Sequence, residues 1–329
     1  MRAVWYDRQG PSREVLQLGE LPDPAPARGE VLVKLHASGV NASDWRMRAG
    51  GMGPMEYPRV VPNSDGAGVV EAAGADVARD WVGRRVWLYN GQRNGRAFGT
   101  AAELIALDVD LVTRLPDRVS FAEGATLGIP CMTAHRCVFV AGPVQGRAVL
   151  VTGGAGAVGH YAVQLASWAG ATVIATVSSE DKAARARAGG AHHVIDYRRQ
   201  DVASEVARLT GGAGVDHVVE VEFGGNLATT LKCVRVNGSI AVYASNAERL
   251  PKLPVHDLMR RNLALHAMYL PACPLEARHR AQSDITAWLD SGERIHAVAD
   301  RYPLAETWAA HDAVERGGKN GTIIVEPAR

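Results

Sequence analysis

The hydrophobic residues of this chain follow one pattern before about residue 129 and another after it. In residues 1 to about 125, short apolar runs such as 31–40 and 84–89 alternate with polar positions and are interrupted by Gly and Pro. Alternation of this kind predicts short β-strands with one buried face. We therefore expect an all-β, partly barrel-like domain here, with the Pro-rich stretch 21–30 as an extended loop.

After residue 129, apolar runs of strand length alternate with segments of helical character. Strands are predicted at 148–153, 171–177, 193–197, 215–222, 239–245 and 263–270, and helices at 157–170, 180–190, 202–210 and 226–234. Strands that alternate with helices of this length predict a parallel sheet covered on both faces. A helix at 281–290 and strands at 296–304 and 321–327 are expected to return to the first domain.

The turn after the predicted strand 148–153 carries a glycine motif. Gly154, Gly156 and Gly159 have the spacing G-x-G-x-x-G. The first glycine permits the tight turn, the second lets a pyrophosphate approach the backbone, and the third packs helix on strand. Because the motif follows a strand and opens a helix, it predicts a dinucleotide site with the pyrophosphate at the helix N-terminus.

The end of the next predicted strand indicates which dinucleotide binds. An acidic residue there would bond the ribose 2′-OH of NAD and repel a 2′-phosphate. Ser178 occupies this place, 19 residues after Gly159, and Lys182 follows it. Glu180 and Asp181 suit a first helical turn, and Lys182 as a solvated residue at a helix start is the alternative. The pattern favours NADPH over NADH.

Composition and charge exclude several classes of protein. The 329 residues are 47% hydrophobic and 22% charged, as in ordinary globular proteins. The 36 basic and 35 acidic residues give a net charge of +1, so we expect no nucleic-acid partner. No run of about 18 apolar residues predicts a membrane span, and the charged first residues lack the apolar core of a signal peptide. The expected location is the cytoplasm.

The chain resembles the zinc-free quinone oxidoreductases of the medium-chain dehydrogenase/reductase family, the zeta-crystallin group. The resemblance is carried by segments 38–50, 60–74, 127–139, 149–159, 190–201 and 317–327. It implies an α/β protein in which 1–128 and 270–329 form a GroES-like, mostly β substrate domain. Residues 129–269 would form a Rossmann NADPH-binding domain with a doubly wound parallel sheet. The resemblance also implies NADPH as hydride donor, a small-molecule acceptor, and a homodimer or homotetramer.

The resemblance assigns roles to individual residues. The 2′-phosphate would be held by Ser178, Lys182 and Tyr197, and the pyrophosphate by Ala155, Gly156, Ala157 and Val158. The nicotinamide half would lie along Val242, Tyr243, Ala244, Ser245, Ala267, Met268 and Tyr269. Asn41 would contact the nicotinamide region, and Arg46 stands where many relatives carry tyrosine.

No metal site is expected. Zinc-dependent relatives carry a G-H-E segment where this chain reads PNSDGAG, and a four-cysteine lobe that it lacks. His36 lies near a possible ligand position without thiolate or Glu partners, and the four cysteines form no C-x-x-C pair. Without a Lewis acid, alcohol oxidation is disfavoured and acceptors that take hydride readily are favoured.

Three functions remain open. The leading hypothesis is NADPH-dependent reduction of a quinone, and the second is reduction of an α,β-unsaturated carbonyl or carboxylate. The third is a non-catalytic crystallin-like or RNA-binding role, which the near-neutral charge disfavours. Arg46 could serve the acceptor, contact the cofactor phosphates or face solvent. Asp44 and Arg48, four residues apart, are expected to form a local pair.

Overall fold

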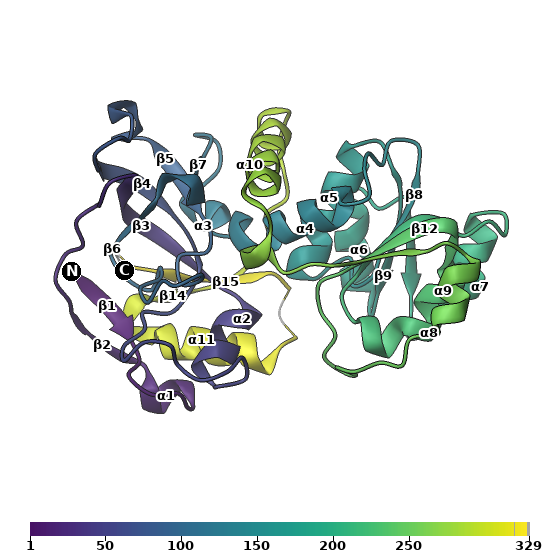
Figure 1. The fold of residues 1–329 in the computed structure, drawn as a ribbon, viewed down its shortest axis with the longest axis horizontal. Coiled ribbons are helices and arrows are strands. Elements are labelled where there is room, and N and C mark those ends of the chain that lie inside the picture. Colours follow the sequence, from purple (N-terminus) through teal and green to yellow (C-terminus); the bar gives the residue numbers. More distant parts are fainter. Residues whose placement is uncertain (319, 328–329) are drawn as a thin grey trace. The chain divides into compact units, whose positions relative to one another are not determined.

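The computed structural model describes residues 1–318 and 320–327. The chain divides into two compact units (Figure 1), of which unit 1 comprises Met1–Ile129 and Gln282–Arg329, and unit 2 comprises Pro130–Ala281. The predicted domain boundaries at 128/129 and 269/270 both lie earlier in the chain than these divisions.

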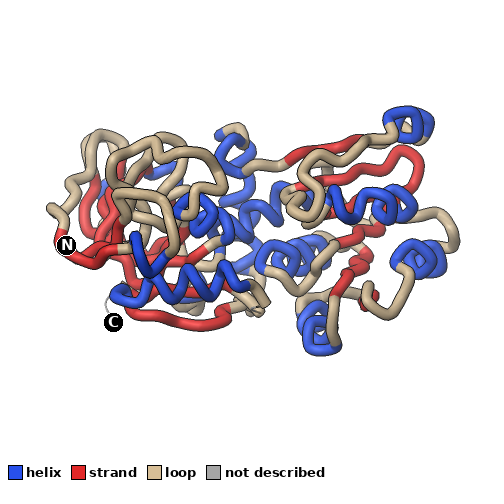
Figure 2. The backbone as a smooth tube through the Cα atoms, turned by 90° about the horizontal axis from the view of Figure 1, so that it is seen from below, coloured by secondary structure: helices blue, strands red, loops and turns tan. Residues whose placement is uncertain are grey.

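Unit 1 is built around a largely antiparallel sheet with the strand order β14-β15-β3-β4-β5-β7, and β6 pairs with β3. The strands are β3 (Glu30–Val40), β4 (Asp65–Ala73), β5 (Arg85–Leu88), β6 (Leu104–Asp108), β7 (Val112–Arg114), β14 (Val298–Pro303) and β15 (Thr322–Glu326), and a separate pair joins β1 (Arg2–Trp5) to β2 (Gln17–Glu20). The first and last described residues both belong to this unit (Figure 2), where the Arg2 side chain donates to Pro327 O at 3.0 Å.

Helices also belong to unit 1, so the expectation of an all-β domain is wrong in detail. They are α1 (Ser12–Val15), α2 (Ala42–Arg48), α3 (Phe121–Gly124) and α11 (Thr307–Arg316), with 3₁₀ turns at Arg79–Trp81, Val109–Leu111 and Leu304–Glu306, while α10 (Leu275–Asp290) spans the division between the units. Helix α11 packs on α2 and β15 (Figure 1). It buries Thr307, Ala310, His311 and Val314, which is the helical spacing i, i+3, i+4, i+7.

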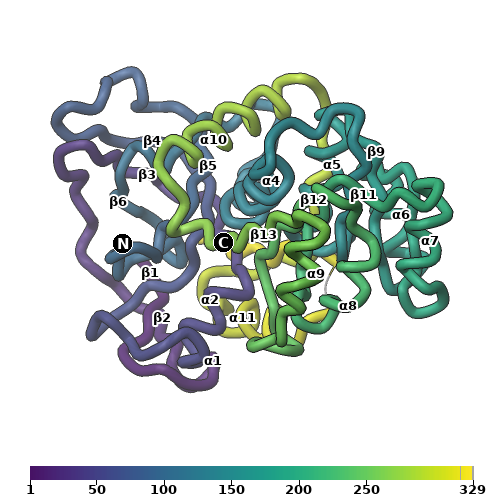
Figure 3. The backbone as a smooth tube through the Cα atoms, turned by 45° about the vertical axis from the view of Figure 1, so that its right-hand side comes forward, coloured from purple at the N-terminus to yellow at the C-terminus, as the bar shows by residue number. Residues whose placement is uncertain are grey.

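Unit 2 holds a parallel sheet with the order β10-β9-β8-β11-β12-β13. Its strands are β8 (Ala148–Val151), β9 (Thr172–Val177), β10 (His193–Asp196), β11 (Val215–Glu220), β12 (Val234–Val242) and β13 (Ala264–Ala267). Its helices are α4 (Met132–Phe139), α5 (Ala157–Trp168), α6 (Glu180–Ala188), α7 (Val202–Leu209), α8 (Phe223–Cys233) and α9 (Val255–Arg260), with a single turn at Leu270–Ala272. A further turn, Leu127–Cys131, spans the division between the units. Figure 3 follows this alternation of strands and helices.

The strand order reverses between β8 and β11, which is the doubly wound Rossmann arrangement. Helix α5 packs on both α4 and α6, and α7 packs on α8. Right-handed crossovers place these two groups on opposite faces of the sheet. In folds of this kind, ligands bind beyond the carboxyl ends of the strands at the reversal point. Among the described residues, no helix is long and apolar enough to cross a membrane.

Candidate cofactor and active site

The glycine motif forms the turn between β8 and α5. Gly156 N donates to Gly153 O at 2.9 Å, which closes the turn. A Cβ atom added at Gly159 would lie 2.2 Å from Gly153 O, and one at Gly154 would lie 2.7 Å from the Cβ of Ala175. The first and third glycines are therefore required by packing. A Cβ at Gly156 would meet Gly153 O at 3.3 Å and nothing else within 4 Å.

The N-terminus of α5 suits an anion. Its N-cap residue is the exposed Gly156, which makes no side-chain cap, and the first turn contains no acidic residue. The first amides of a helix have no intrahelical acceptor, and the helix dipole favours negative charge there. Ala157 and Val158 in the first turn are half-buried. A pyrophosphate therefore fits this turn.

Ser178 and Lys182 meet at the end of β9. Lys182 Nζ donates to Ser178 Oγ at 3.0 Å, and the serine is 8% exposed. Glu180, the acidic neighbour, pairs instead with Arg187 at 2.8 Å. Among the described residues no carboxylate pairs with Lys182, so its charge remains available to a ligand. Tyr197, which follows β10, is 51% exposed.

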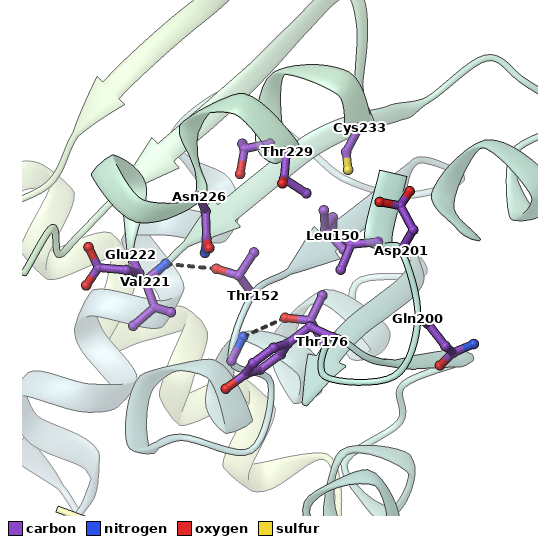
Figure 4. A pocket seen from close by; sticks show the side chains of 14 residues that line it. Leu150, Thr152, Thr176, Gln200, Asp201, Val221, Glu222, Asn226, Thr229 and Cys233 are labelled. Carbon is purple, nitrogen blue, oxygen red and sulfur yellow. Dashed lines mark hydrogen bonds between the residues drawn. The ribbon is translucent and has the colours of Figure 1, made fainter. Parts of the chain in front are cut away.

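A cavity of about 410 Å³ lies inside unit 2 beside this turn. Figure 4 shows Glu222 and Asn226 on one side of it and Gln200 and Asp201 on the other. Its walls come from the ends of β8, β9 and β11, from the loop after β10, and from α7 and α8. This is the position expected for part of a dinucleotide. The lining residues are Leu150, Thr152, Gly153, Thr176, Tyr197, Gln200, Asp201, Val202, Val221, Glu222, Asn226, Thr229, Thr230 and Cys233.

A buried carboxylate that the sequence analysis missed organises this cavity. Glu220, the last residue of β11, is 0% exposed. It accepts hydrogen bonds from Thr152 Oγ1 at 2.8 Å, Asn226 Nδ2 at 2.9 Å and Thr230 Oγ1 at 2.7 Å. All three donors line the cavity. The sequence signal was an acidic residue closing an apolar strand, but its partners are brought together only by the fold.

Thr176 is a second residue that sequence reasoning missed. Its Oγ1 accepts from Gly153 N at 3.1 Å (Figure 4), and its carbonyl accepts from Gly154 N at 2.9 Å. The glycine turn is therefore tied to the end of β9.

The residues predicted for the nicotinamide half lie at the carboxyl ends of β12 and β13. Val242 and Ala267 are register partners, and Met268 N donates to Val242 O at 2.7 Å. Ser245 Oγ accepts from Gly224 N at 2.9 Å, which ties this loop to α8. The predicted cofactor residues of unit 2 thus lie at or just after the carboxyl ends of its strands.

Asn41 and Arg46 belong to unit 1, at the start and in the middle of α2. Asn41 is 8% exposed, and its Nδ2 donates to Asp65 Oδ2 at 2.7 Å. Arg46 is half-buried with its guanidinium 5.4 Å from the ring centre of Trp45. No described residue forms an ion pair with Arg46, so its charge is uncompensated by the protein.

The predicted pair between Asp44 and Arg48 is wrong. Asp44 pairs with Arg93 at 2.8 Å, and Arg48 pairs with Glu315 of α11 at 2.7 Å. Asp44 Oδ2 also accepts from Asn41 N at 2.7 Å, as an N3 residue does in a capping box. The carboxylate is therefore turned toward the helix start, away from Arg48.

His36 stacks on Phe121 with 4.3 Å between ring centres, and burial lowers the pKa of the imidazole. Cys131, Cys137 and Cys233 are buried free thiols, and Cys273 is a partly exposed free thiol. Among the described residues, no group of three or more His, Cys, Asp or Glu side chains could hold a metal ion.

Comparison with known proteins gives two family matches. Residues 27–117 match the alcohol dehydrogenase GroES-like domain, and residues 157–283 match the zinc-binding dehydrogenase domain. The rat quinone oxidoreductase is 30% identical, over 99% of this chain and 97% of that relative. The chain belongs to the quinone oxidoreductase group of the medium-chain dehydrogenase/reductase family.

Two further known proteins are similar to this chain over nearly its whole length. A 2-haloacrylate reductase of a Burkholderia species is 33% identical, over 99% of both chains. A mycobacterial protein solved in complex with NADPH has a TM-score of 0.85 and 30% identity, over 99% of this chain and 100% of that one. The predicted fold class is confirmed: the protein combines a GroES-like domain with a Rossmann sheet.

Proposed function

We propose that this family member is an NADPH-dependent oxidoreductase that reduces a quinone. The observation that carries the proposal is the contact at the end of β9 in which Lys182 Nζ lies 3.0 Å from Ser178 Oγ. Among the described residues, no carboxylate pairs with this lysine. A 2′-phosphate is recognised by a cation and a hydroxyl, whereas a strand end that selects NAD carries an acid. The relatives named quinone oxidoreductase and the NADPH complex support the same reading.

The residues that would hold NADPH lie at the carboxyl ends of the strands of the unit 2 sheet. The first amides of α5 would bind the pyrophosphate, and Ser178, Lys182 and Tyr197 the 2′-phosphate. The loops after β12 and β13 would support the nicotinamide half. Bound NADPH supplies the hydride, so the protein mainly binds and orients the reactants. Asn41, held by Asp65 and by the start of α2, would orient the reacting groups.

A second candidate function is reduction of an activated C=C bond. The observation that favours it is the unpaired guanidinium of Arg46 on α2. An α,β-unsaturated acceptor that gains hydride at its β-carbon carries negative charge on its carbonyl oxygen, and a nearby cation would stabilise that charge. The relative named 2-haloacrylate reductase is consistent with this chemistry.

The deciding experiment is NADPH oxidation by the purified protein with a panel of quinones, enones and unsaturated acids. Turnover of quinones above the other classes supports the main proposal. Turnover of enones or acids alone supports the second candidate. Binding of NADPH without turnover of any acceptor would contradict both and favour a non-catalytic role.

We expect Arg46 to favour unsaturated carbonyl and carboxylate acceptors over neutral quinones, and the variant Arg46→Tyr tests this expectation. If the guanidinium serves a carbonyl or carboxylate oxygen, the variant should lose about tenfold or more in kcat/KM on unsaturated acids, since a charge-assisted hydrogen bond contributes about 1.5–3 kcal/mol. Activity on neutral quinones and the Kd of NADPH should change little. Equal losses on both acceptor classes, or weaker NADPH binding alone, would contradict this role.

We also propose that the enzyme needs no zinc. The proposal rests on the missing cysteine lobe and on the PNSDGAG segment, where zinc-dependent relatives carry ligands. Elemental analysis of the purified protein should find no stoichiometric zinc, and EDTA should leave its turnover unchanged. Zinc that is bound at one per chain and lost together with activity would overturn the proposal.

We propose a homodimer formed through the open edge of the unit 2 sheet. Within the described residues, β13 is the outermost strand of this sheet and pairs only with β12, so its other side has no partner strand. Leu265 on β13 is 40% exposed, and Met259 on the preceding α9 is 68% exposed. An apolar edge strand invites pairing with a second copy across a two-fold axis. Light scattering should give twice the chain mass of 35.0 kDa; a monomer would contradict the proposal, and a tetramer would require a further interface.

A further inference from the structure

Asp65 begins β4 and is 0% exposed. The surrounding backbone is shaped around its carboxyl group. A Cβ atom added at Gly128 would lie 2.2 Å from Asp65 Oδ1 and 2.3 Å from the Asp65 Cγ. Gly128 is thus kept small by the carboxyl group that packs on it.

The hydrogen bonds to this carboxyl group come from two separate segments. Asn41 Nδ2 donates to Oδ2 at 2.7 Å. Ile129 N donates to Oδ1 at 2.8 Å and to Oδ2 at 2.9 Å. Every partner is a donor, so the arrangement suits a hydrogen-bond acceptor. Asparagine at this position would place an NH₂ group against one of these donors.

Asp65 joins the start of α2, at Asn41, to the end of the first segment of unit 1, at Ile129. Asn41 caps α2 and is one of the two candidate active-site residues of unit 1. Ile129 is the last residue of the first segment of unit 1, and the chain enters unit 2 at Pro130. One side chain therefore holds both the Asn41 amide and the peptide through which the chain leaves unit 1.

Two charged groups act on Asp65. Asp44 on α2 repels it, and Arg93, in the loop after β5, attracts it. Arg93 is committed to Asp44 through a contact of 2.8 Å and gives Asp65 no direct bond. Burial and the Asp44 carboxylate raise the pKa of Asp65 to about 8, while the bonds from Asn41 and Ile129 N oppose that shift.

We infer that Asp65 is a positioning residue, which fixes the Asn41 amide and the Ile129 peptide in one arrangement for the reaction. The inference rests on the proposed function, since it takes Asn41 to orient the reacting groups. A purely structural role is the alternative: the bonds would then stabilise unit 1 without affecting the turnover of folded protein. The two readings differ in whether Asp65 acts through Asn41.

A double-mutant cycle on Asp65→Asn and Asn41→Ala separates these readings. At about pH 9, where Asp65 is mostly ionised, each single variant should lower kcat about tenfold or more, since loss of orientation in an active site can cost about 100-fold. The Kd of NADPH should stay within about twofold in both, because the residues proposed to hold its pyrophosphate and 2′-phosphate all belong to unit 2, whereas Asp65 and Asn41 belong to unit 1. The double variant should be no slower than Asn41→Ala. Independent effects that multiply in the double variant would overturn the inference.

Thr307→Val is the matched control. Thr307 is also a 0% exposed polar residue of unit 1, and its Oγ1 donates to Leu304 O at 2.7 Å. This variant loses a buried hydrogen bond without touching Asn41, so it should lose stability and keep its kcat.

The wild type is assayed first. An inactive wild type contradicts the proposed function, whereas an active wild type with a multiplying cycle contradicts only the role of Asp65.

A pH profile provides a second readout that does not require Asp65→Asn to fold. Above its pKa, ionised Asp65 holds the Asn41 amide more strongly, because a charged acceptor strengthens the hydrogen bond. The kcat ratio of wild type to Asn41→Ala should therefore rise from about pH 7 to about pH 9. A constant ratio over this range would overturn the inference.

Stability gives a readout without any catalysis. A carboxyl group whose folded pKa lies above its unfolded value contributes stability at low pH that is lost as the pH rises through the folded pKa. The wild type should therefore lose thermal stability up to about pH 8. In Asp65→Asn this part of the loss should disappear. An unchanged slope would contradict the assignment of the titrating group.

Discussion

Gly156→Ala should remove most NADPH binding while leaving the fold intact. Within the protein, the added methyl group would meet only Gly153 O, at 3.3 Å, a tight contact that a shift of a few tenths of an ångström relieves. It would instead occupy the space through which the pyrophosphate approaches the amides of α5. Losing two charge-assisted hydrogen bonds, at about 1.5–3 kcal/mol each, weakens binding by about 100-fold or more. NADPH fluorescence titration measures the Kd, and circular dichroism with thermal unfolding measures the fold.

Gly159→Ala is the matched comparison, because it adds the same methyl group three residues away. There the Cβ atom would lie 2.2 Å from Gly153 O, so the backbone must move. Overpacking of this kind costs about 1–3 kcal/mol, or a fall of several degrees in Tm for a chain of this size. Gly156→Ala should show no such fall. Equal losses of stability in the two variants would contradict the steric prediction for Gly156, and normal NADPH binding by Gly156→Ala would show that the pyrophosphate does not lie at this turn.

The parallel sheet of unit 2 was predictable because its signals are local. The apolar run before the glycine motif became β8 at Ala148–Val151, and the segment after it became α5 at Ala157–Trp168. Boundaries were less accurate. The helix predicted at 226–234 begins at Phe223, and Val234 already belongs to β12, which continues through Asn237 at a positive φ of 60°. Asn237 and Gly238 form a pair that is typical of turns, so the sequence does not indicate that the first half of β12 belongs to the strand.

The polar contacts of unit 1 could not be predicted from spacing. Asp44 and Arg48 are four residues apart on one helix, yet each finds its partner far away in the sequence, at Arg93 and Glu315. A local pair on an exposed helix contributes little free energy, and α2 is not exposed on this side. Once tertiary packing buries both charges, partners that complete their hydrogen bonds determine the pairing.

The same limit applies to the cavity of unit 2. Thr152, Asn226 and Thr230 look like ordinary polar residues of a strand end and a helix in the sequence. Only the fold shows that they converge on the buried Glu220. In contrast, Ser178 and Lys182 lie four residues apart around a helix start, so their contact follows from local geometry and was predictable.

Lys182→Ala should weaken NADPH binding by about 10- to 150-fold and leave NADH binding nearly unchanged. The ammonium group lies 3.0 Å from Ser178 Oγ, and no described carboxylate neutralises it. Hydrogen bonds to a charged group contribute about 1.5–3 kcal/mol, which gives this range. The effect should also shrink as salt is added, because the contact is electrostatic. Both dissociation constants are measured by titration of nucleotide fluorescence at two salt concentrations.

Lys252→Ala is the control, since it removes an exposed lysine of unit 2 elsewhere. It reports any effect of net charge alone on the binding of an anionic nucleotide. If Lys182→Ala weakened NADH as much as NADPH, the lysine would act on the part that the two nucleotides share. If it weakened neither, the ammonium group would be a solvated residue at the start of α6. Only selective weakening of NADPH is consistent with a lysine that meets the 2′-phosphate, the group in which the two nucleotides differ.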